Sequence, residues 1–175
     1  MIETKFTEVA KQYKCDYNVN HYTVNGKVGA KIPISVYTLT LNYRNIVINL
    51  NFELGNHNLA EVKFIFYTKA TIPSFDLETK DHFSRLFSFK KAPWNIKSKN
   101  EVITAKIIQL LAATGLTKIA NEVAFEPHIT ALQSNKEFQF TTRFYLGFAY
   151  KEKTIAPVLE FHKGVIDYLY NSYWN

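Results

Sequence analysis

Cysteine is almost absent from this sequence, and long apolar runs are absent altogether. The single Cys15 excludes an internal disulfide bond and any metal site built from several cysteines, and a reducing cytoplasmic setting is the simpler expectation. No stretch of about 18 apolar residues is present, so the sequence predicts no membrane span. Nucleophile elbows, Walker loops and dinucleotide fingerprints are also missing, so no cofactor is expected and the sequence leans away from an enzyme.

Glycine and proline are scarce, with 6 and 5 residues, whereas 15% of the residues are aromatic. Aromatic side chains at this density, most of them Phe and Tyr, favour broad β-sheets packed on helices. A chain of 175 residues fits one domain with a sizeable core. The formal net charge of +6 permits an acidic partner, such as nucleic acid, an anionic membrane surface or an acidic protein, without requiring one.

The N-terminal part of the chain reads as a helix followed by an antiparallel meander. Residues 2–14 carry apolar side chains at helical spacing and predict a short amphipathic helix. The period changes to two near Asp16, and the dipeptide Asn25-Gly26 predicts a two-residue type I′ hairpin, because both central residues of that turn need positive φ. Pro33 has no amide hydrogen to donate, so the strand that follows is expected to break there or to lie at an edge.

Alternation of apolar and polar residues over 46–54 predicts a half-buried strand, which turns at 55–58 into a further strand. A second hairpin is expected at 128–133 and 137–150. Its second arm is predicted to be an unusually long strand that bends near Gly147. One face of that arm is formed by Phe138, Phe140, Thr142, Phe144, Leu146, Phe148 and Tyr150.

A helix is predicted at 99–114. Ser98 and Glu101 form a capping-box pattern, in which the serine side chain caps the helix and the glutamate reaches back to the serine amide. An apolar stripe follows, and Gly115 is the natural residue just beyond the C-terminus of the helix. Residues 116–125 allow a further helical turn or two.

The last predicted element is a helix at 154–172, with Thr154 as its N-cap and a wide apolar stripe. Gly164 in its middle costs about 1 kcal/mol relative to alanine unless another element packs closely there. The elements together predict a single α+β domain over residues 1–175. Its antiparallel sheet of about six or seven strands carries a short N-terminal helix, a middle helix and the long C-terminal helix on one face. Three aromatic residues of the 137–150 arm, Phe140, Phe144 and Phe148, are expected to be buried beneath Leu159, Ile166 and Leu169.

The segment 74–99 divides the two halves, and residues within it favour either a short helix at 79–88 or an aromatic strand at 83–89. Its basic part is a candidate binding surface for an acidic protein or a single-stranded nucleic acid, since lysines neutralise phosphates and an indole stacks on bases. The alternative is a lysine-rich loop in which Trp94 fills the edge of the core. The candidate binding residues are Arg85, Lys90, Lys91, Trp94, Lys97 and Lys99.

Two groups of acidic and histidine residues offer ligands for a hard cation, but neither has the spacing of a known metal motif. A solvated turn with a helix cap accounts for the first group, and a structural histidine near the end of a strand accounts for the second, so no metal site is predicted. His162, on the apolar stripe of the last helix, is expected to be a hydrogen-bonded core residue. The two groups are Asp76, Glu78, Asp81 and His82, and Glu122, Glu126 and His128.

From Phe75 onward the order of elements resembles a group of uncharacterised bacterial α+β proteins. The resemblance depends on the dipeptide Phe75-Asp76 after a β-meander, on the aromatic segment 82–89, and on the helix, strand pair and long C-terminal helix that follow. It implies the fold and no activity, because that group has no established activity. Some members of the group carry transmembrane helices, which this sequence lacks.

Two functions of different classes are consistent with the sequence. The first is a non-enzymatic cytoplasmic interaction module that uses the aromatic and basic surface around Trp94. The second is a binder of a small apolar molecule, held between the curved sheet and the C-terminal helix in a pocket of roughly 300 Å³ or more. Whether the sheet and that helix enclose a cavity or a packed core separates the two.

Overall fold

The computed structural model describes residues 2–26, 29–79 and 93–174. Its strands are β1 (Asp16–Asn25), β2 (Lys31–Tyr43), β3 (Ile46–Leu54), β4 (Leu59–Tyr67), β5 (Phe75–Thr79), β6 (Trp94–Lys97), β7 (His128–Ser134) and β8 (Glu137–Tyr145). Its α-helices are α1 (Ile2–Tyr13), α3 (Glu101–Ala113), α4 (Leu116–Glu122) and α5 (Ile155–Tyr173), the last preceded by a 3₁₀ helix at Lys151–Thr154.

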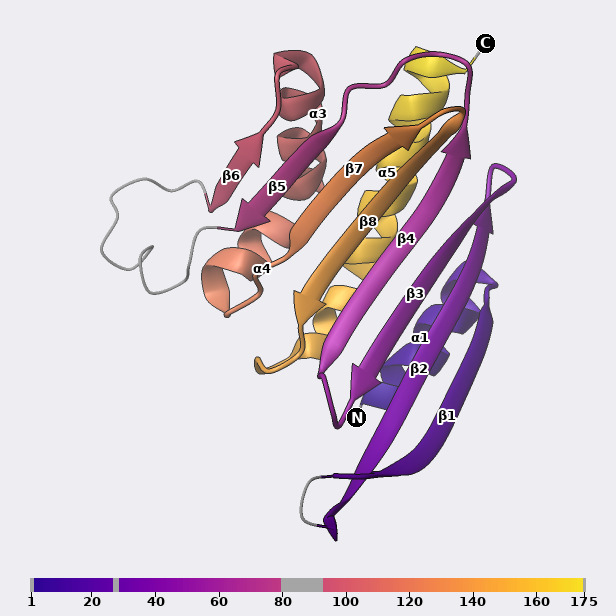
Figure 1. The fold of residues 1–175 in the computed structure, drawn as a ribbon, viewed down its shortest axis with the longest axis vertical. Coiled ribbons are helices and arrows are strands. Elements are labelled where there is room, and N and C mark those ends of the chain that lie inside the picture. Colours follow the sequence, from indigo (N-terminus) through magenta and orange to yellow (C-terminus); the bar gives the residue numbers. More distant parts are fainter. Residues whose placement is uncertain (1, 27–28, 80–92, 175) are drawn as a thin grey trace.

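All eight strands of the described residues form one antiparallel sheet in the order β1-β2-β3-β4-β8-β7-β5-β6, and the helices lie against one of its faces (Figure 1). The predicted α+β class with an antiparallel sheet and a long C-terminal helix is therefore confirmed. The predicted count of six or seven strands is wrong, because β5 and β6 pair within the segment that was expected to divide the chain.

The first hairpin differs from its prediction. Asn25 pairs with Lys31, so the connection is longer than the two-residue type I′ turn expected at Asn25-Gly26. β2 also runs unbroken through Pro33, which lies opposite Thr23. The expectation of an edge holds locally, since pairing between β2 and β3 begins only at Ser35 and leaves Pro33 with a neighbour on one side.

The segment that follows β5 lies partly outside the described residues. The choice between a helix at 79–88 and a strand at 83–89 concerns residues 80–92, of which the structure describes none. The later hairpin is confirmed, but β8 ends at Tyr145 and is shorter than the predicted 137–150 arm. A Cβ on Gly147 would clash with the ring of Tyr145 as that ring lies in the structure.

The middle helix begins with a different cap from the one predicted. The side chain of Asn100, and not that of Ser98, accepts the hydrogen bond from the amide of Ile103, at 3.0 Å. The Ser98 hydroxyl instead accepts from the amide of Asn100. Gly115 follows the helix with φ +80°, as predicted for the residue that ends it.

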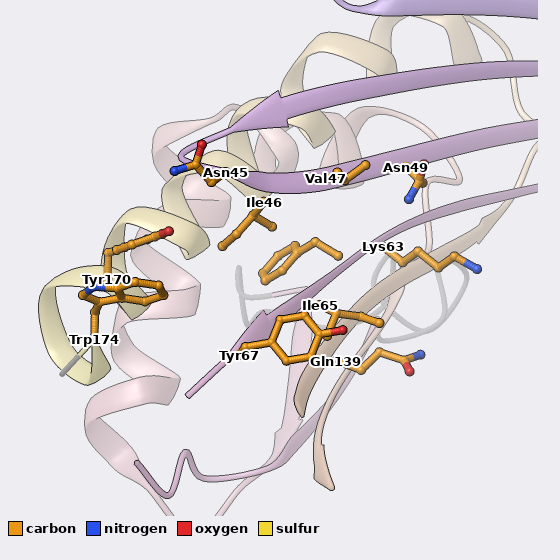
Figure 2. A pocket seen from close by; sticks show the side chains of 11 residues that line it. Asn45, Ile46, Val47, Asn49, Lys63, Ile65, Tyr67, Gln139, Tyr170 and Trp174 are labelled. Carbon is orange, nitrogen blue, oxygen red and sulfur yellow. The ribbon is translucent and has the colours of Figure 1, made fainter. Parts of the chain in front are cut away.

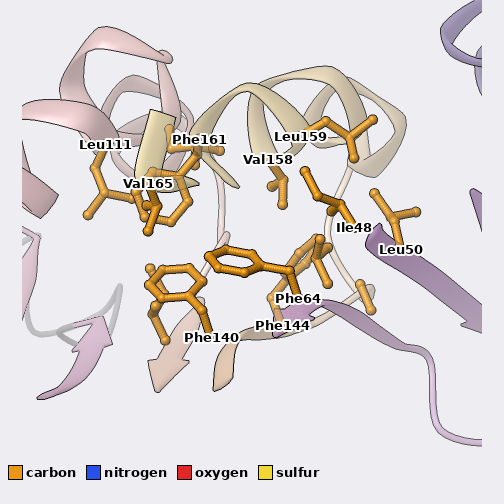
Figure 3. Close-up of a cluster of buried hydrophobic side chains, with 14 of the residues drawn as sticks. Ile48, Leu50, Phe64, Leu111, Phe140, Phe144, Val158, Leu159, Phe161 and Val165 are labelled. Atoms are coloured by element: carbon orange, nitrogen blue, oxygen red, sulfur yellow. The ribbon is translucent and has the colours of Figure 1, made fainter. Parts of the chain in front are cut away.

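The hydrophobic core lies between the inner face of the sheet and α5 (Figure 3). As predicted, Phe140 and Phe144 are buried, and so is Phe148 in the turn beyond β8. Their rings and those of neighbouring strands fill the centre of this interface against the apolar stripe of the helix. The side chains labelled in Figure 3 include Phe64, Phe140, Phe144, Val158, Leu159 and Phe161, each at most 2% exposed.

Among the described residues, no single helix is both long and apolar enough to cross a bilayer. α3 and α4 taken together have sufficient length and apolar composition, and a bend of 70° separates them.

Candidate functional site

The edges of β3 and β4 part at one end of the sheet. The two strands are paired only as far as Asn49 opposite Lys63. Beyond that point residues 46–48 are paired with β2 alone, and residues 64–67 with β8 alone. The facing backbone edges therefore form no ladder with each other, and their amide and carbonyl groups are open to another partner.

A groove of about 480 Å³ lies where the strands part (Figure 2). Because side chains alternate along a strand, the groove receives residues from both faces of the sheet. Ile46 and Phe64 belong to the buried inner face and form its base, whereas Val47, Ile65 and Tyr67 belong to the exposed outer face and form its mouth. The volume falls within the range of small-molecule sites.

Two aromatic residues from the end of α5 close one end of the groove. The ring centroids of Tyr170 and Trp174 lie 4.5 Å apart. Each ring packs edge-to-face with the ring of Phe66, at centroid distances of 5.5 and 5.7 Å. Figure 2 shows the two rings side by side at the end of the groove away from Asn49. Trp174 remains 55% exposed, so an aromatic surface is available to a ligand.

The β2–β3 turn is fastened to α5. Arg44 and Asn45 form a two-residue turn with φ of 50° and 61°, as in a type I′ hairpin. The Arg44 side chain pairs with Asp167 at 2.7 Å, and the hydroxyl of Tyr170 donates to the carbonyl of Arg44 at 2.6 Å. Tyr43 donates to the same Asp167 carboxylate.

The end of β4 is fastened to the β7–β8 turn and to the last residue of α5. The amide of Thr68 donates to the carbonyl of Lys136 at 2.9 Å, which holds this end beside the β7–β8 turn. The Thr68 hydroxyl donates to the carbonyl of Tyr173 at 2.8 Å. α5 thus anchors both the β2–β3 turn and the end of β4, and the β7–β8 turn holds β4 as well, so the gap between the strands is fixed by the fold.

Polar groups surround the apolar part of the groove. Asn45, Asn49 and Gln139 offer amides, and Lys63 pairs with Glu61 at 3.2 Å. Partial burial by itself raises the pKa of the Glu61 carboxyl, but hydrogen bonds from Arg143 and Lys63 outweigh it and hold that pKa below its ordinary value. Glu61 is therefore ionised at neutral pH and forms ion pairs with both Arg143 and Lys63.

The basic surface predicted from the sequence is only partly described. Arg85, Lys90 and Lys91 lie outside the described residues. Lys97 and Lys99 are exposed, and Lys97 pairs with Glu78 at 3.1 Å.

The expectation of an exposed Trp94 is wrong. Its ring is 7% exposed and belongs to the core, and its indole N–H donates to the hydroxyl of Thr117 on α4. Trp94 alternates with Asn95 and faces inward from β6, so it has no surface on which a base can stack. The alternative interpretation, a tryptophan that fills the edge of the core, describes its position.

Members of the two predicted acidic groups meet on the outer face. Ligand atoms of Asp76, Glu78 and His128 lie within 4.8 Å of one another, because β5 pairs with β7. His128 Nε2 is 3.0 Å from Asp76, and Glu78 is taken by Lys97. Among the described residues no fourth ligand joins them, and the contacts are those of an exposed polar network. Asp81 and His82 lie outside the described residues.

Three further residues with side chains that can take part in chemistry, His162, His57 and Cys15, have contacts that fit a structural role. His162 is fully buried and hydrogen-bonded, as expected. His57 lies in the exposed β3–β4 turn, where its ring contacts the amide of Asn56 at 3.0 Å. Cys15 is half-buried, and burial raises the pKa of its thiol, which makes it a weaker nucleophile.

The groove was not predicted from the sequence, although one signal for it is present. On a sheet with one exposed face, outward positions are expected to be polar. Val47, Ile65 and Tyr67 are apolar or aromatic at outward positions, and all three line the groove.

No family model matches the chain, and neither the curated proteins nor the solved structures provide a match. The resemblance to uncharacterised bacterial proteins stays a prediction. Fold and site together describe an α+β protein whose open sheet is covered on one face and carries a groove between two parted strands.

Proposed function

We propose that this protein is a non-enzymatic binding protein that holds a small, mainly apolar molecule in the groove between β3 and β4. The observation that carries the proposal is the combination of an apolar base, formed by Ile46 and Phe64, with an accessible aromatic end, formed by Tyr170 and Trp174. Apolar surfaces with a few polar groups around them are typical of small-molecule sites.

The proposed site differs from the place that the sequence suggested. Side chains fill the centre of the interface between α5 and the sheet, which supports a site at the end of that interface. There the open backbone edges of β3 and β4 can pair with polar groups of the ligand. Tyr and Trp offer large contact areas at a small loss of side-chain entropy.

The test uses N-phenyl-1-naphthylamine, a neutral probe whose emission rises in apolar surroundings. Binding in the groove should raise the probe emission and quench Trp174, and Trp174→Phe should remove the quenching. Ile65→Glu places a charge at the mouth and should weaken binding at least tenfold, because an ionised carboxylate beside an apolar ligand is costly to desolvate.

Leu132→Glu is the matched control. Leu132 is also exposed on the outer face, in the same row of the sheet as Ile65, and does not line the groove. It should leave binding unchanged. Equal affinities of the two variants for the probe would place binding elsewhere and exclude the proposed function.

A second candidate keeps the interaction module that the sequence favoured. Lys97 and Lys99 line, with Ser74 and Ser98, a separate hollow of about 600 Å³. Two lysines beside two hydroxyls suit an acidic protein partner, which they would steer in a salt-dependent manner. Poly-glutamate tests this candidate. The affinity of the protein for poly-glutamate should fall as salt is added, and it should be lower in the variant Lys97→Gln/Lys99→Gln. If neither change lowers the affinity, the second candidate is excluded.

A further inference from the structure

The groove continues into a second hollow. A space of about 240 Å³ is lined by Thr68, Lys69 and Lys136 together with Tyr67 and Trp174, and the last two residues also line the groove. A molecule that lies against Tyr67 and Trp174 can therefore extend from the apolar groove to the two lysines.

The two lysines are available for a ligand. Neither forms an ion pair with a residue that the structure describes, and both are exposed. Lys63, at the other side of the groove, by contrast forms an ion pair with Glu61 at 3.2 Å. Glu137 faces Tyr67 across the β4–β8 register and offsets one of the charges. The second hollow thus keeps a net positive charge next to an aromatic surface.

We propose that the ligand of the groove is an amphiphilic anion. Its apolar or aromatic body lies on Phe64, Tyr170 and Trp174, and its carboxylate, sulfonate or phosphate group lies between Lys69 and Lys136. The placement follows from charge complementarity, since an anionic group fits two unpaired ammonium groups, and from the walls that the two hollows share. This inference rests on the proposed function and adds the chemical class of the molecule.

Two probes with the same body separate the inference from the function on which it rests. 1-Anilinonaphthalene-8-sulfonate carries a sulfonate, and N-phenyl-1-naphthylamine lacks it. In the variant Lys69→Gln/Lys136→Gln the affinity for the sulfonate should fall about three- to tenfold, as for two exposed charge contacts. The affinity for the neutral probe should not change. Lys106→Gln/Lys118→Gln, on α3 and α4, removes the same charge far from these hollows and should alter neither affinity.

Salt provides an independent check. The affinity for the sulfonate should fall between low and physiological ionic strength in the wild type, and lose most of that dependence in Lys69→Gln/Lys136→Gln. If both probes bind in the groove and the lysine variant weakens neither, the inference is overturned and the proposed function stands. If Ile65→Glu weakens neither probe, the proposed function and the inference both fail.

Discussion

Leu110 of α3 occupies the space that Gly164 leaves on α5. A Cβ built on Gly164 would lie 2.8 Å from Cδ2 of Leu110, closer than packed carbon atoms approach. A glycine in the middle of a helix costs about 1 kcal/mol relative to alanine. The close packing of α3 against α5 at Gly164 offsets this cost.

Gly164→Ala should therefore change the stability little. The helix gains about 1 kcal/mol of propensity, and the displacement of the Leu110 side chain offsets that gain. In a Leu110→Ala background the same change should stabilise the protein by about 1 kcal/mol. Urea denaturation of the four proteins of this double-mutant cycle measures the coupling, and a coupling energy near zero would contradict the contact.

His162 provides a pH-dependent contribution to stability. Its Nδ1 lies 2.8 Å from the carbonyl of Val158, and its Nε2 lies 3.4 Å from the hydroxyl of Thr142. The ring thus donates through Nδ1–H and accepts through Nε2, which is a neutral tautomer. Burial lowers the pKa of His162 from 6.5 to about 4, and hydrogen bonds with the backbone of Val158 and Val62 offset this only in part.

The sign of the effect follows from the protons bound in each state. Below pH 6.5 the unfolded chain takes up a proton at His162 that the folded protein does not accept until about pH 4. The contribution of His162 to the free energy of unfolding is therefore fully present above pH 6.5. It falls by about 1.4 kcal/mol per pH unit as the pH drops from 6.5 to about 4, a loss of about 3 kcal/mol in total. Urea denaturation of His162→Gln should lack this slope, whereas His57→Gln, in an exposed turn, should keep it.

Phe144 tests the packing of the core. Its ring contacts those of Phe52 and Phe125 at centroid distances of 5.6 and 4.9 Å, and it is 2% exposed. Phe144→Ala should cost about 3–5 kcal/mol of unfolding free energy through lost transfer energy and a residual cavity. The next residue, Tyr145, points to the outer face and is 62% exposed, so Tyr145→Ala should cost far less. Similar losses in the two variants would mean that the strand faces the other way.

Much of the sheet is predictable from the sequence because burial on one face imposes a period of two. β3 and β8 have that alternation over most of their length, and their positions were expected. β6 was not expected, since its four residues, Trp94–Lys97, lie among lysines and present only two inward side chains. A strand that short has too few residues for its period to be recognised.

The groove depends on contacts that no local pattern contains. Apolar and polar residues alternate along 46–54 in the same way where β3 is paired with both β2 and β4 and where, as at Ile46, it is paired with β2 alone. Tyr170 and Trp174 reach the groove from the end of α5, more than a hundred residues further along the chain. The interpretation of Trp94 as an exposed residue failed for the opposite reason: the lysines around it suggested exposure, but the alternation of β6 turns the indole inward.

The hydroxyl of Tyr170 is expected to preserve the shape of the groove. It donates to the carbonyl of Arg44 at 2.6 Å and so joins α5 to the turn from which β3 begins. Tyr170→Phe keeps the ring that lines the groove and removes this bond. A neutral hydrogen bond contributes about 0.5–1.5 kcal/mol. The affinity for N-phenyl-1-naphthylamine should therefore fall about two- to tenfold as the turn loosens.

The control for Tyr170→Phe is Tyr145→Phe, which removes an exposed hydroxyl on the outer face, outside the groove. Its affinity for the probe should equal that of the wild type. Fluorescence titration measures both affinities, and urea denaturation verifies that both variants are folded. If Tyr170→Phe binds the probe as tightly as the wild type, the ring alone forms that end of the groove. The bond to Arg44 would then have no part in binding, because the pair of Arg44 with Asp167 would suffice to hold the turn on α5.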